Sequence, residues 1–277
     1  MSFERHPWNT GFEWPRHEEP FRVVSEEQAR AYDERGFFIL EDALDPETLS
    51  KLDAEIAPFD EQALEFLRGQ PEGRLSLAGV DTVSIALHLV RHSPALRAFC
   101  ASPLFADLCH DLVGPDVRLY WDQAVYKQPH GAEPVLWHQD NGYTYVEPQA
   151  YLTCWVAITD ATLDNGCVWV LPGVHRAGTL AHRATPIGYQ CAENPEGAVP
   201  VSVRAGSIVV FSSLTPHATG HNVTADVRKA YIVQFAPDGA LALRGDPDAG
   251  SGSPEPQNDT DRQFFVLREG ARVGKGT

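Results

Sequence analysis

The segment VLWHQDNGY, residues 135–143, places a histidine and an aspartate two positions apart, as His138 and Asp140. In an extended segment, residues i and i+2 project to the same side, so the imidazole and the carboxylate could converge on one point. Both side chains are common metal ligands. Two ligands do not make a metal site, however, so a third must come from elsewhere in the chain.

Histidines downstream of this pair are the candidates for the third ligand, and there are four of them: His175, His182, His217 and His221. His217 follows the strongest strand signal in the chain, GSIVVFSS, and could be held rigidly at a strand end. Pro216 and Gly220 argue against a helix there, so His217 and His221 are not expected to share a helical face. The spacing favours His217 and leaves the other histidines open.

A metal held on one face by two histidines and one carboxylate keeps coordination positions open on the other face. This ligand set is typical of non-haem Fe(II) oxygenases. Zinc hydrolysis is the competing chemistry, because an open position on zinc activates water. The ligand types alone leave three alternatives: an oxygenase, a zinc-dependent hydrolase on the same ligands, and a non-catalytic metal-binding, cupin-like module.

The composition narrows the class of protein and of partner. A chain of 277 residues is long enough for one large domain or two small ones, and its net charge of −16 argues against nucleic acid as a partner. Neither a membrane-spanning apolar run nor a signal-peptide core is found in the sequence, so we expect a cytoplasmic protein without a membrane partner. The five cysteines are odd in number and lack CxxC spacing, which argues against a disulfide framework or a zinc knuckle.

The elements that must position these residues divide the chain near residue 115. Residues 1–24 are predicted to form a surface arm without periodicity. Helix-capping signals then predict helices over 25–36, 45–59 and 93–114, with Ser25 and Gln28 spaced as a capping box. The short apolar run GFFIL predicts a buried strand between the first two helices.

The segments after residue 115 are rich in β-branched and aromatic residues and are bounded by turn residues, which predicts a β-sandwich or barrel. They are VRLYWDQAVYKQP, AYLTCWVAITDA, NGCVWVLPG, VPVSVRAGSIVVFSS and RKAYIVQFAP. The composition of DPDAGSGSPEPQNDTD predicts a flexible loop, and RQFFVL after it predicts one last strand.

Three of these motifs, WHQDNGY, NGCVWVLPGVH and FSSLTPHATGHNVTADVRKAYIVQF, occur in an order that resembles the phytanoyl-CoA dioxygenase superfamily of Fe(II)- and 2-oxoglutarate-dependent oxygenases. The resemblance is strongest from residue 120 onward. It implies a mainly β fold with flanking helices, the double-stranded β-helix or jelly roll of cupin-like proteins. Within a single oxygenase domain over 1–277, we expect an arm (1–24), a mainly helical part (25–115), a jelly-roll core (116–237), and a loop with a C-terminal strand (238–277).

Carried over position by position, the resemblance implies that His138, Asp140 and His217 are the iron ligands. Arg228, eleven residues after His217, matches the family arginine that holds the distal carboxylate of 2-oxoglutarate. The planar guanidinium suits that role because it forms two parallel charge-assisted bonds with a carboxylate. The alternative is a surface ion pair. Lys229 is expected to face the opposite side of the strand.

Gln123 and Trp155 fall where relatives contact the cosubstrate, although Trp155 could equally be core packing. Many relatives carry a hydroxyl residue two positions after the arginine, where this chain has Ala230, so the second carboxylate contact is unassigned. Four further residues are candidates for the substrate pocket, with surface aromatics as the alternative for the tyrosines: Tyr126, Asn141, Tyr143 and Tyr145. No catalytic residue beyond the metal centre is predicted.

The chemistry implied by the resemblance uses Fe(II), 2-oxoglutarate and O₂, releases succinate and CO₂, and oxidises a C–H bond of the substrate. Hydroxylation is the default outcome, while desaturation, ring formation and epoxidation use the same residues. Related halogenases replace the metal carboxylate by a small residue, so Asp140 argues against halogenation. Because the sequence shows no basic cluster for a CoA phosphate, we expect a small free metabolite or natural-product intermediate as substrate.

Overall fold

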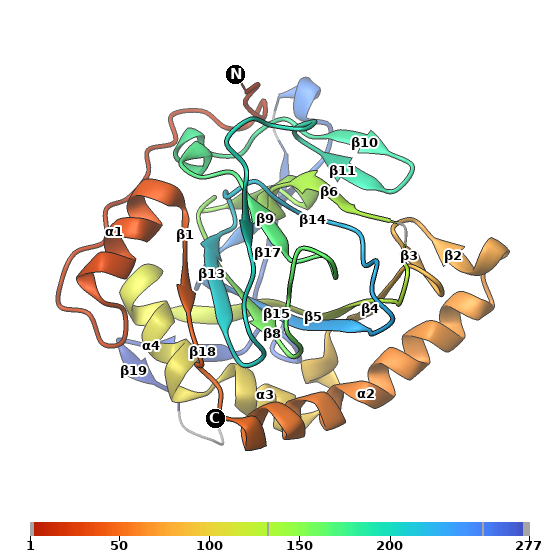
Figure 1. Cartoon of the computed structure of the whole chain (residues 1–277). Coiled ribbons are helices and arrows are strands. Elements are labelled where there is room, and N and C mark those ends of the chain that lie inside the picture. Colours follow the sequence, from red (N-terminus) through yellow and green to blue (C-terminus); the bar gives the residue numbers. More distant parts are fainter. Residues whose placement is uncertain (1–2, 132, 251, 274–277) are drawn as a thin grey trace.

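The computed structural model describes residues 3–131, 133–250 and 252–273. Its centre is a pair of antiparallel β-sheets with helices outside them (Figure 1). The larger sheet has the strand order β1 (Phe37–Leu40), β13 (Ile208–Ser212), β8 (Leu152–Ala157), β15 (Arg228–Pro237), β5 (Val117–Lys127), β18 (Phe265–Arg268) and β19 (Ala271–Arg272), and β4 (Val83–Leu87) also pairs with β5. The smaller sheet has the order β12 (Val199–Val201), β9 (Val168–Val170), β14 (His217–Thr219) and β6 (Val135–His138).

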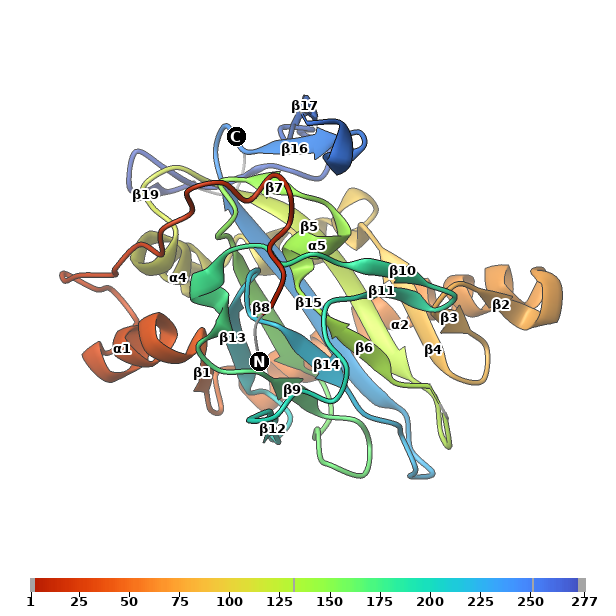
Figure 2. The same cartoon turned by 90° about the horizontal axis from the view of Figure 1, so that it is seen from above.

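The remaining strands of the described residues form three short ribbons. They are β17 (Ser253–Pro256), β16 (Leu241–Arg244) and β7 (Val146–Glu147); β10 (Arg183–Thr185) and β11 (Gly188–Gln190); and β2 (Arg74–Leu75) and β3 (Ala78–Gly79). Seen from above, β6, β14 and β9 lie over the larger sheet, with β10 and β11 beside them (Figure 2). This mainly β architecture with flanking helices is that of a jelly roll, as predicted.

The period of two in the central strands produces two hydrophobic layers. In β8, Cys154 and Val156 belong to the core on the helical side of the larger sheet, whereas Trp155 and Ala157 belong to the core between the sheets. Successive residues of a strand point to opposite faces, so a strand covered on both sides must be apolar throughout. The sequence LTCWVA meets this requirement, and every residue of β8 is buried.

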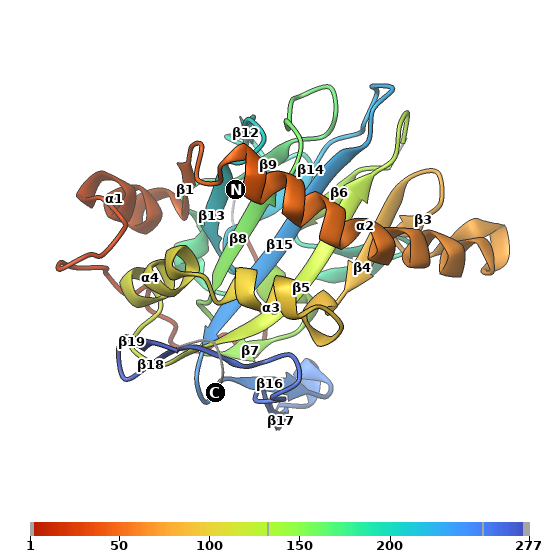
Figure 3. The same cartoon turned by 90° about the horizontal axis from the view of Figure 1, so that it is seen from below.

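Helices α2 (Pro46–Arg68) and α3 (Pro94–Cys100) cross the outer face of the larger sheet (Figure 3). Helices α1 (Glu26–Arg35) and α4 (Pro103–Leu112) lie at its β1 and β19 ends. The capping box of Ser25 and Gln28 is formed, and the Asp45 carboxylate accepts a hydrogen bond of 2.8 Å from the backbone N–H of Thr48. These caps satisfy N–H groups that have no partner within the helix.

Local signals were less accurate about where elements end. Helix α2 continues through Pro58 to Arg68, because its buried face packs against the larger sheet. The predicted helix over 93–114 is two helices, separated where Pro103 begins the second. Strand β4 lies within the part that was predicted to be mainly helical, and β17 lies within the predicted flexible loop.

All five cysteines lie in the described part of the chain and are free thiols. Among residues 3–131, 133–250 and 252–273, no helix combines the length and apolar character needed to cross a membrane.

Candidate metal centre

A cavity of about 820 Å³ lies between the two sheets. Its inner part contains His138, Asp140, His217 and Arg228, and its outer part reaches α2 and the β2–β3 ribbon. Residues far apart in the sequence therefore meet in one space, which the pairing of the strands creates.

The two histidines are brought together by strand register. His138 ends β6 and His217 begins β14, and the antiparallel pairing sets them directly opposite each other with ring centroids 4.2 Å apart. Asp140 begins the single-turn helix α5 (Asp140–Tyr143) rather than continuing the strand, but the intervening Gln139 is extended. One donor atom from each of the three side chains lies within 4.8 Å of the others, and His217 Nε2 is 3.8 Å from Asp140 Oδ1.

Hydrogen bonds orient all three side chains. The Nδ1 atoms of His138 and His217 lie 2.7 Å and 3.0 Å from the carbonyl oxygens of Leu136 and Thr215. A carbonyl can only accept, so each Nδ1 carries the proton and each Nε2 presents a lone pair. Thr153 Oγ1 donates to Asp140 Oδ2 at 2.6 Å, which leaves Oδ1 available. Such supporting bonds are typical of metal ligands.

Burial prepares the donor atoms electrostatically. It lowers the pKa of His138 to about 3, with a further contribution from the neighbouring His217, and lowers the pKa of His217 to about 4. Burial also raises the pKa of the Asp140 carboxyl, whereas the neighbouring His138 acts to lower that pKa. Both imidazoles are therefore neutral near pH 7, which is the form that binds a metal. The donor set fits a divalent cation with open positions on its other side.

A second group of polar atoms in the cavity lacks partners. Arg228 is 1% exposed, and only its Nη1 donates, to the Val125 carbonyl at 3.4 Å. Its Nε and Nη2, and the hydroxyl of Thr219, are buried without a hydrogen-bond partner among the described residues. Burial lowers the pKa of the guanidinium to about 10, so it stays charged at neutral pH. Buried donors without acceptors are costly, and this forked set suits a carboxylate.

Three other predicted residues line the same cavity: Gln123, Trp155 and Tyr143. The Trp155 ring lies 5.1 Å from the Arg228 guanidinium carbon, so it both fills the core between the sheets and packs against the arginine. The Tyr143 ring meets His138 edge-on with centroids 5.1 Å apart.

The other three predicted pocket residues lie elsewhere. Tyr126 is on the helical face of β5, opposite to Gln123, and its hydroxyl donates to Asp53 at 3.5 Å. Asn141 is fully buried, and its side chain accepts from the backbone N–H of Val146 at 2.9 Å. The hydroxyl of Tyr145 donates to Glu147 at 3.0 Å, and its ring packs on Trp8. In a continued strand, Asn141, Tyr143 and Tyr145 would all point away from the side of His138 and Asp140. The α5 turn breaks this alternation and brings only Tyr143 to the cavity.

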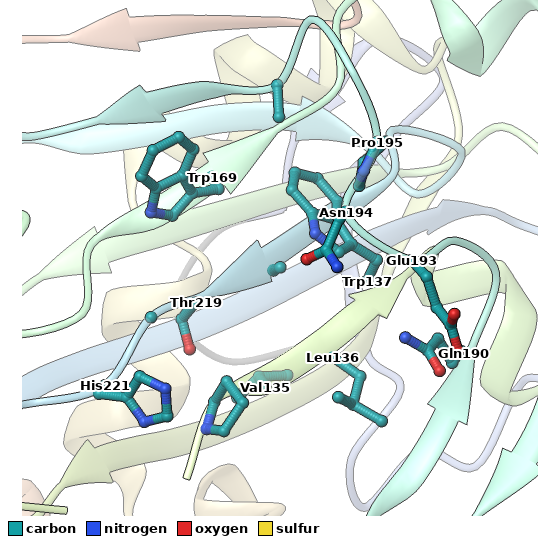
Figure 4. Close-up of a pocket in the computed structure, with 14 residues that line it drawn as sticks. Val135, Leu136, Trp137, Trp169, Gln190, Glu193, Asn194, Pro195, Thr219 and His221 are labelled. Atoms are coloured by element: carbon teal, nitrogen blue, oxygen red, sulfur yellow. The ribbon is translucent and has the colours of Figure 1, made fainter. Parts of the chain in front are cut away.

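The remaining histidines have separate surroundings. His182 Nε2 accepts a 2.9 Å hydrogen bond from the backbone of Gln139, and His175 is buried with Nε2 3.2 Å from the Asp33 carbonyl. His221 is exposed and lines a second pocket of about 610 Å³ with Trp137 and Trp169, to which both β6 and β14 contribute (Figure 4). His217 therefore lines the cavity that contains His138 and Asp140, whereas His221 does not.

Lys229 faces away from the cavity, as predicted, and its Nζ is 2.8 Å from Asp53 Oδ1. Two hydroxyl residues of the site were not predicted, Thr219 and Thr153. The signal for Thr219 was present, because it lies two residues after His217 in a strand and so shares its face. The position two residues after Arg228, where many relatives carry a hydroxyl, is Ala230 in this chain. No sequence signal pointed to Thr153.

Comparisons with known proteins agree with this geometry. The family model "Phytanoyl-CoA dioxygenase (PhyH)" matches residues 32–230. A phytanoyl-CoA dioxygenase of Arabidopsis thaliana is 28% identical over 158 residues, 55% of each chain. The phytanoyl-CoA dioxygenase domain-containing protein 1 of Rattus norvegicus is 31% identical over 163 residues, again 55% of each. The matches thus span about half the length of these curated relatives.

Two solved structures share the fold. The non-heme alpha ketoglutarate dependent carbocyclase SnoK from nogalamycin biosynthesis has a TM-score of 0.67 at 24% identity, covering 89% of this chain and 97% of that one. The epimerase SnoN, solved in complex with Fe³⁺, alpha ketoglutarate and nogalamycin RO, has a TM-score of 0.63 at 22% identity, covering 87% and 98%.

Proposed function

The chain belongs to the phytanoyl-CoA dioxygenase family, and from that membership we propose that it is an Fe(II)- and 2-oxoglutarate-dependent dioxygenase that hydroxylates a C–H bond of a small molecule. One observation carries the proposal. A single cavity contains both the convergent donors of His138, Asp140 and His217 and the buried, unpartnered donors of Arg228 and Thr219. A metal and a carboxylate cosubstrate would use both groups at once.

Each of these residues has a defined task. The Nε2 atoms of the two histidines and Oδ1 of Asp140 would hold Fe(II), and Thr153 keeps the other carboxylate oxygen occupied. Arg228 Nε and Nη2 would pair with the distal carboxylate of 2-oxoglutarate, and the Thr219 hydroxyl would donate to the same group. When bound, iron with 2-oxoglutarate and O₂ supplies the oxidation, in which the keto acid becomes succinate and CO₂ and one oxygen atom enters the substrate C–H bond.

Related structures support the cosubstrate assignment, since SnoN was solved with Fe³⁺ and alpha ketoglutarate. The arginine adds an argument from this chain alone. A zinc-dependent hydrolase or a non-catalytic metal-binding module on the same ligands would have no use for a buried guanidinium whose Nε and Nη2 lack an acceptor among the described residues. A dicarboxylate that bridges metal and arginine accounts for both.

The proposal is tested by anaerobic titration of Fe(II) and 2-oxoglutarate into the metal-free protein. We expect the weak visible charge-transfer band of a chelated keto acid, and succinate release once O₂ is admitted. Tight zinc binding with ester or amide hydrolysis and no band would favour the hydrolase. Metal retention without either activity would leave a binding module. Once a substrate is found, mass spectrometry of the product should show one added oxygen atom and not the loss of two hydrogens.

A further inference from the structure

The outer part of the cavity differs in chemistry from the inner part. Beyond the metal centre, its wall is built from apolar side chains of α2, the β2–β3 ribbon and β4, among them Phe59, Phe66, Leu75, Ile85 and Leu87. Several of these remain open to solvent: Phe66 is 57%, Leu75 54% and Leu87 50% exposed. Large apolar side chains left exposed together at the mouth of a cavity mark a binding surface.

Charge is nearly missing from this wall. With histidine counted as neutral, the only lining residues with a formal charge, among those the structure describes, are Asp140 and Arg228, and both belong to the metal and cosubstrate site. Basic side chains around the outer part are paired with carboxylates: Arg68 with Glu65 at 3.0 Å, and Arg74 with Glu133 at 2.7 Å. Arg244, whose Nη1 donates to Thr144 at 3.5 Å, is paired with Glu255 at 2.9 Å. A charged substrate would lose its hydration in the cavity without gaining a counter-charge.

The polar atoms that line the outer part are those of Gln62, Ser76 and Thr144 and of the His92 imidazole. The amide and hydroxyl groups can hydrogen-bond to hydroxyl or carbonyl groups but cannot neutralise an ion. The volume of about 820 Å³ lies within the range of roughly 300–1,000 Å³ that encloses drug-sized ligands. Space therefore remains for a substantial substrate when 2-oxoglutarate occupies the Arg228 end.

We infer that the substrate is an uncharged, predominantly apolar molecule of drug-like size, with a few neutral oxygen groups, and not an ion, a zwitterion or a nucleotide thioester. This inference rests on the proposed function, because it takes the metal centre to be the place of reaction. The body of the substrate would lie against the α2, β2–β3 and β4 wall. Its reacting C–H bond would point inward, past Tyr143, toward His138.

The test uses three ligands with the same ring system: 2-naphthalenemethanol (neutral), 2-naphthoate (an anion) and 2-naphthylmethylammonium (a cation). Binding is measured by calorimetry on the anaerobic protein loaded with Fe(II) and 2-oxoglutarate. We expect the neutral ligand to bind at least about tenfold more tightly than either ion, since only the ions lose charge hydration without compensation. Equal affinities, a preference for an ion, or no binding of the neutral ligand would overturn the inference.

A pair of matched variants locates the effect. Leu75→Asp places a charge at the cavity mouth, whereas Leu163→Asp places one at an equally exposed leucine, 56% against 54%, that does not line the cavity. Leu75→Asp should weaken the neutral ligand about fivefold and strengthen the cation, and Leu163→Asp should change neither. Equal effects of the two variants would show that the ligand binds elsewhere.

The same experiment distinguishes a failure of the dioxygenase proposal from a failure of the proposed substrate class. The charge-transfer band is read in the same sample before any naphthalene is added. Its absence contradicts the dioxygenase proposal, whereas a normal band with preferred binding of an ion contradicts only the substrate class.

Discussion

Arg228→Gln separates the cosubstrate site from the metal site in a single substitution. The guanidinium is 1% exposed, and its Nε and Nη2 have no acceptor among the described residues. If these two groups pair with the distal carboxylate of 2-oxoglutarate, glutamine removes the charge and the forked geometry together. Iron affinity should barely change, because the arginine is not among the donors that converge with His138 and His217.

The size of the effect follows from the kind of bond that is lost. A hydrogen bond to a charged group contributes roughly 1.5–3 kcal/mol, and about 1.4 kcal/mol corresponds to a tenfold change in affinity. Loss of one such interaction should therefore weaken 2-oxoglutarate binding roughly 10- to 100-fold. In the cosubstrate-free protein, the substitution should not lower the free energy of unfolding, because it removes a buried, unpaired charge.

The assay is the charge-transfer band, followed during titration with 2-oxoglutarate, together with urea unfolding of the cosubstrate-free protein. Lys229→Gln is the matched control, since Lys229 is the next residue but pairs with Asp53 outside the cavity. Thr219→Val should give a smaller loss than Arg228→Gln, because it removes a neutral donor. A folded Arg228→Gln protein with unchanged 2-oxoglutarate affinity would refute the reasoning, and the cosubstrate would have to bind elsewhere.

Two further predictions concern the histidines. His217→Ala should abolish iron binding, measured as metal retained after gel filtration, whereas His221→Ala should retain it because His221 lines the second pocket; the reverse result would refute the choice of third ligand. The metal-free protein should lose stability as the pH falls below about 6.5, because unfolded histidine takes up a proton there while burial keeps the pKa of His175 at about 4. At about pH 5 the lost free energy of unfolding amounts to roughly 2 kcal/mol for one such histidine. Between about pH 7.5 and pH 5, His175→Gln should therefore lose less free energy of unfolding than the unsubstituted protein, by about that amount. An unchanged pH dependence in the variant would contradict the lowered pKa of His175.

The parts of the molecule that could be predicted from the sequence depend on short-range patterns. The capping box at Ser25 and the cap at Asp45 involve residues three apart, so local backbone geometry decides them. The alternation along β15 similarly separates Arg228 from Lys229, because neighbouring residues of a strand point to opposite faces. The jelly roll was predicted from such strand patterns together with the order of the three motifs that resemble the family.

Other features depend on which segments pair, and local patterns do not contain that information. Spacing alone left four candidates for the third histidine, and the register of β14 against β6 is what sets His217 opposite His138. Thr219 lies on the His217 face of β14, so the packing of β14 over the larger sheet also brings its hydroxyl into the cavity with Arg228.

Tyr126 also shows what a local strand pattern cannot determine. Alternation along β5 predicts that Tyr126 and Gln123 face opposite ways, but only the packing of α2 on the larger sheet decides which face is turned away from the cavity. Near Asp140, the backbone turns into α5 and brings Tyr143, but not Asn141 or Tyr145, to the cavity. A strand's own sequence determines which residues share a face, whereas the partners that cover each face are fixed by contacts between segments distant in the chain, and these exist only in the folded molecule.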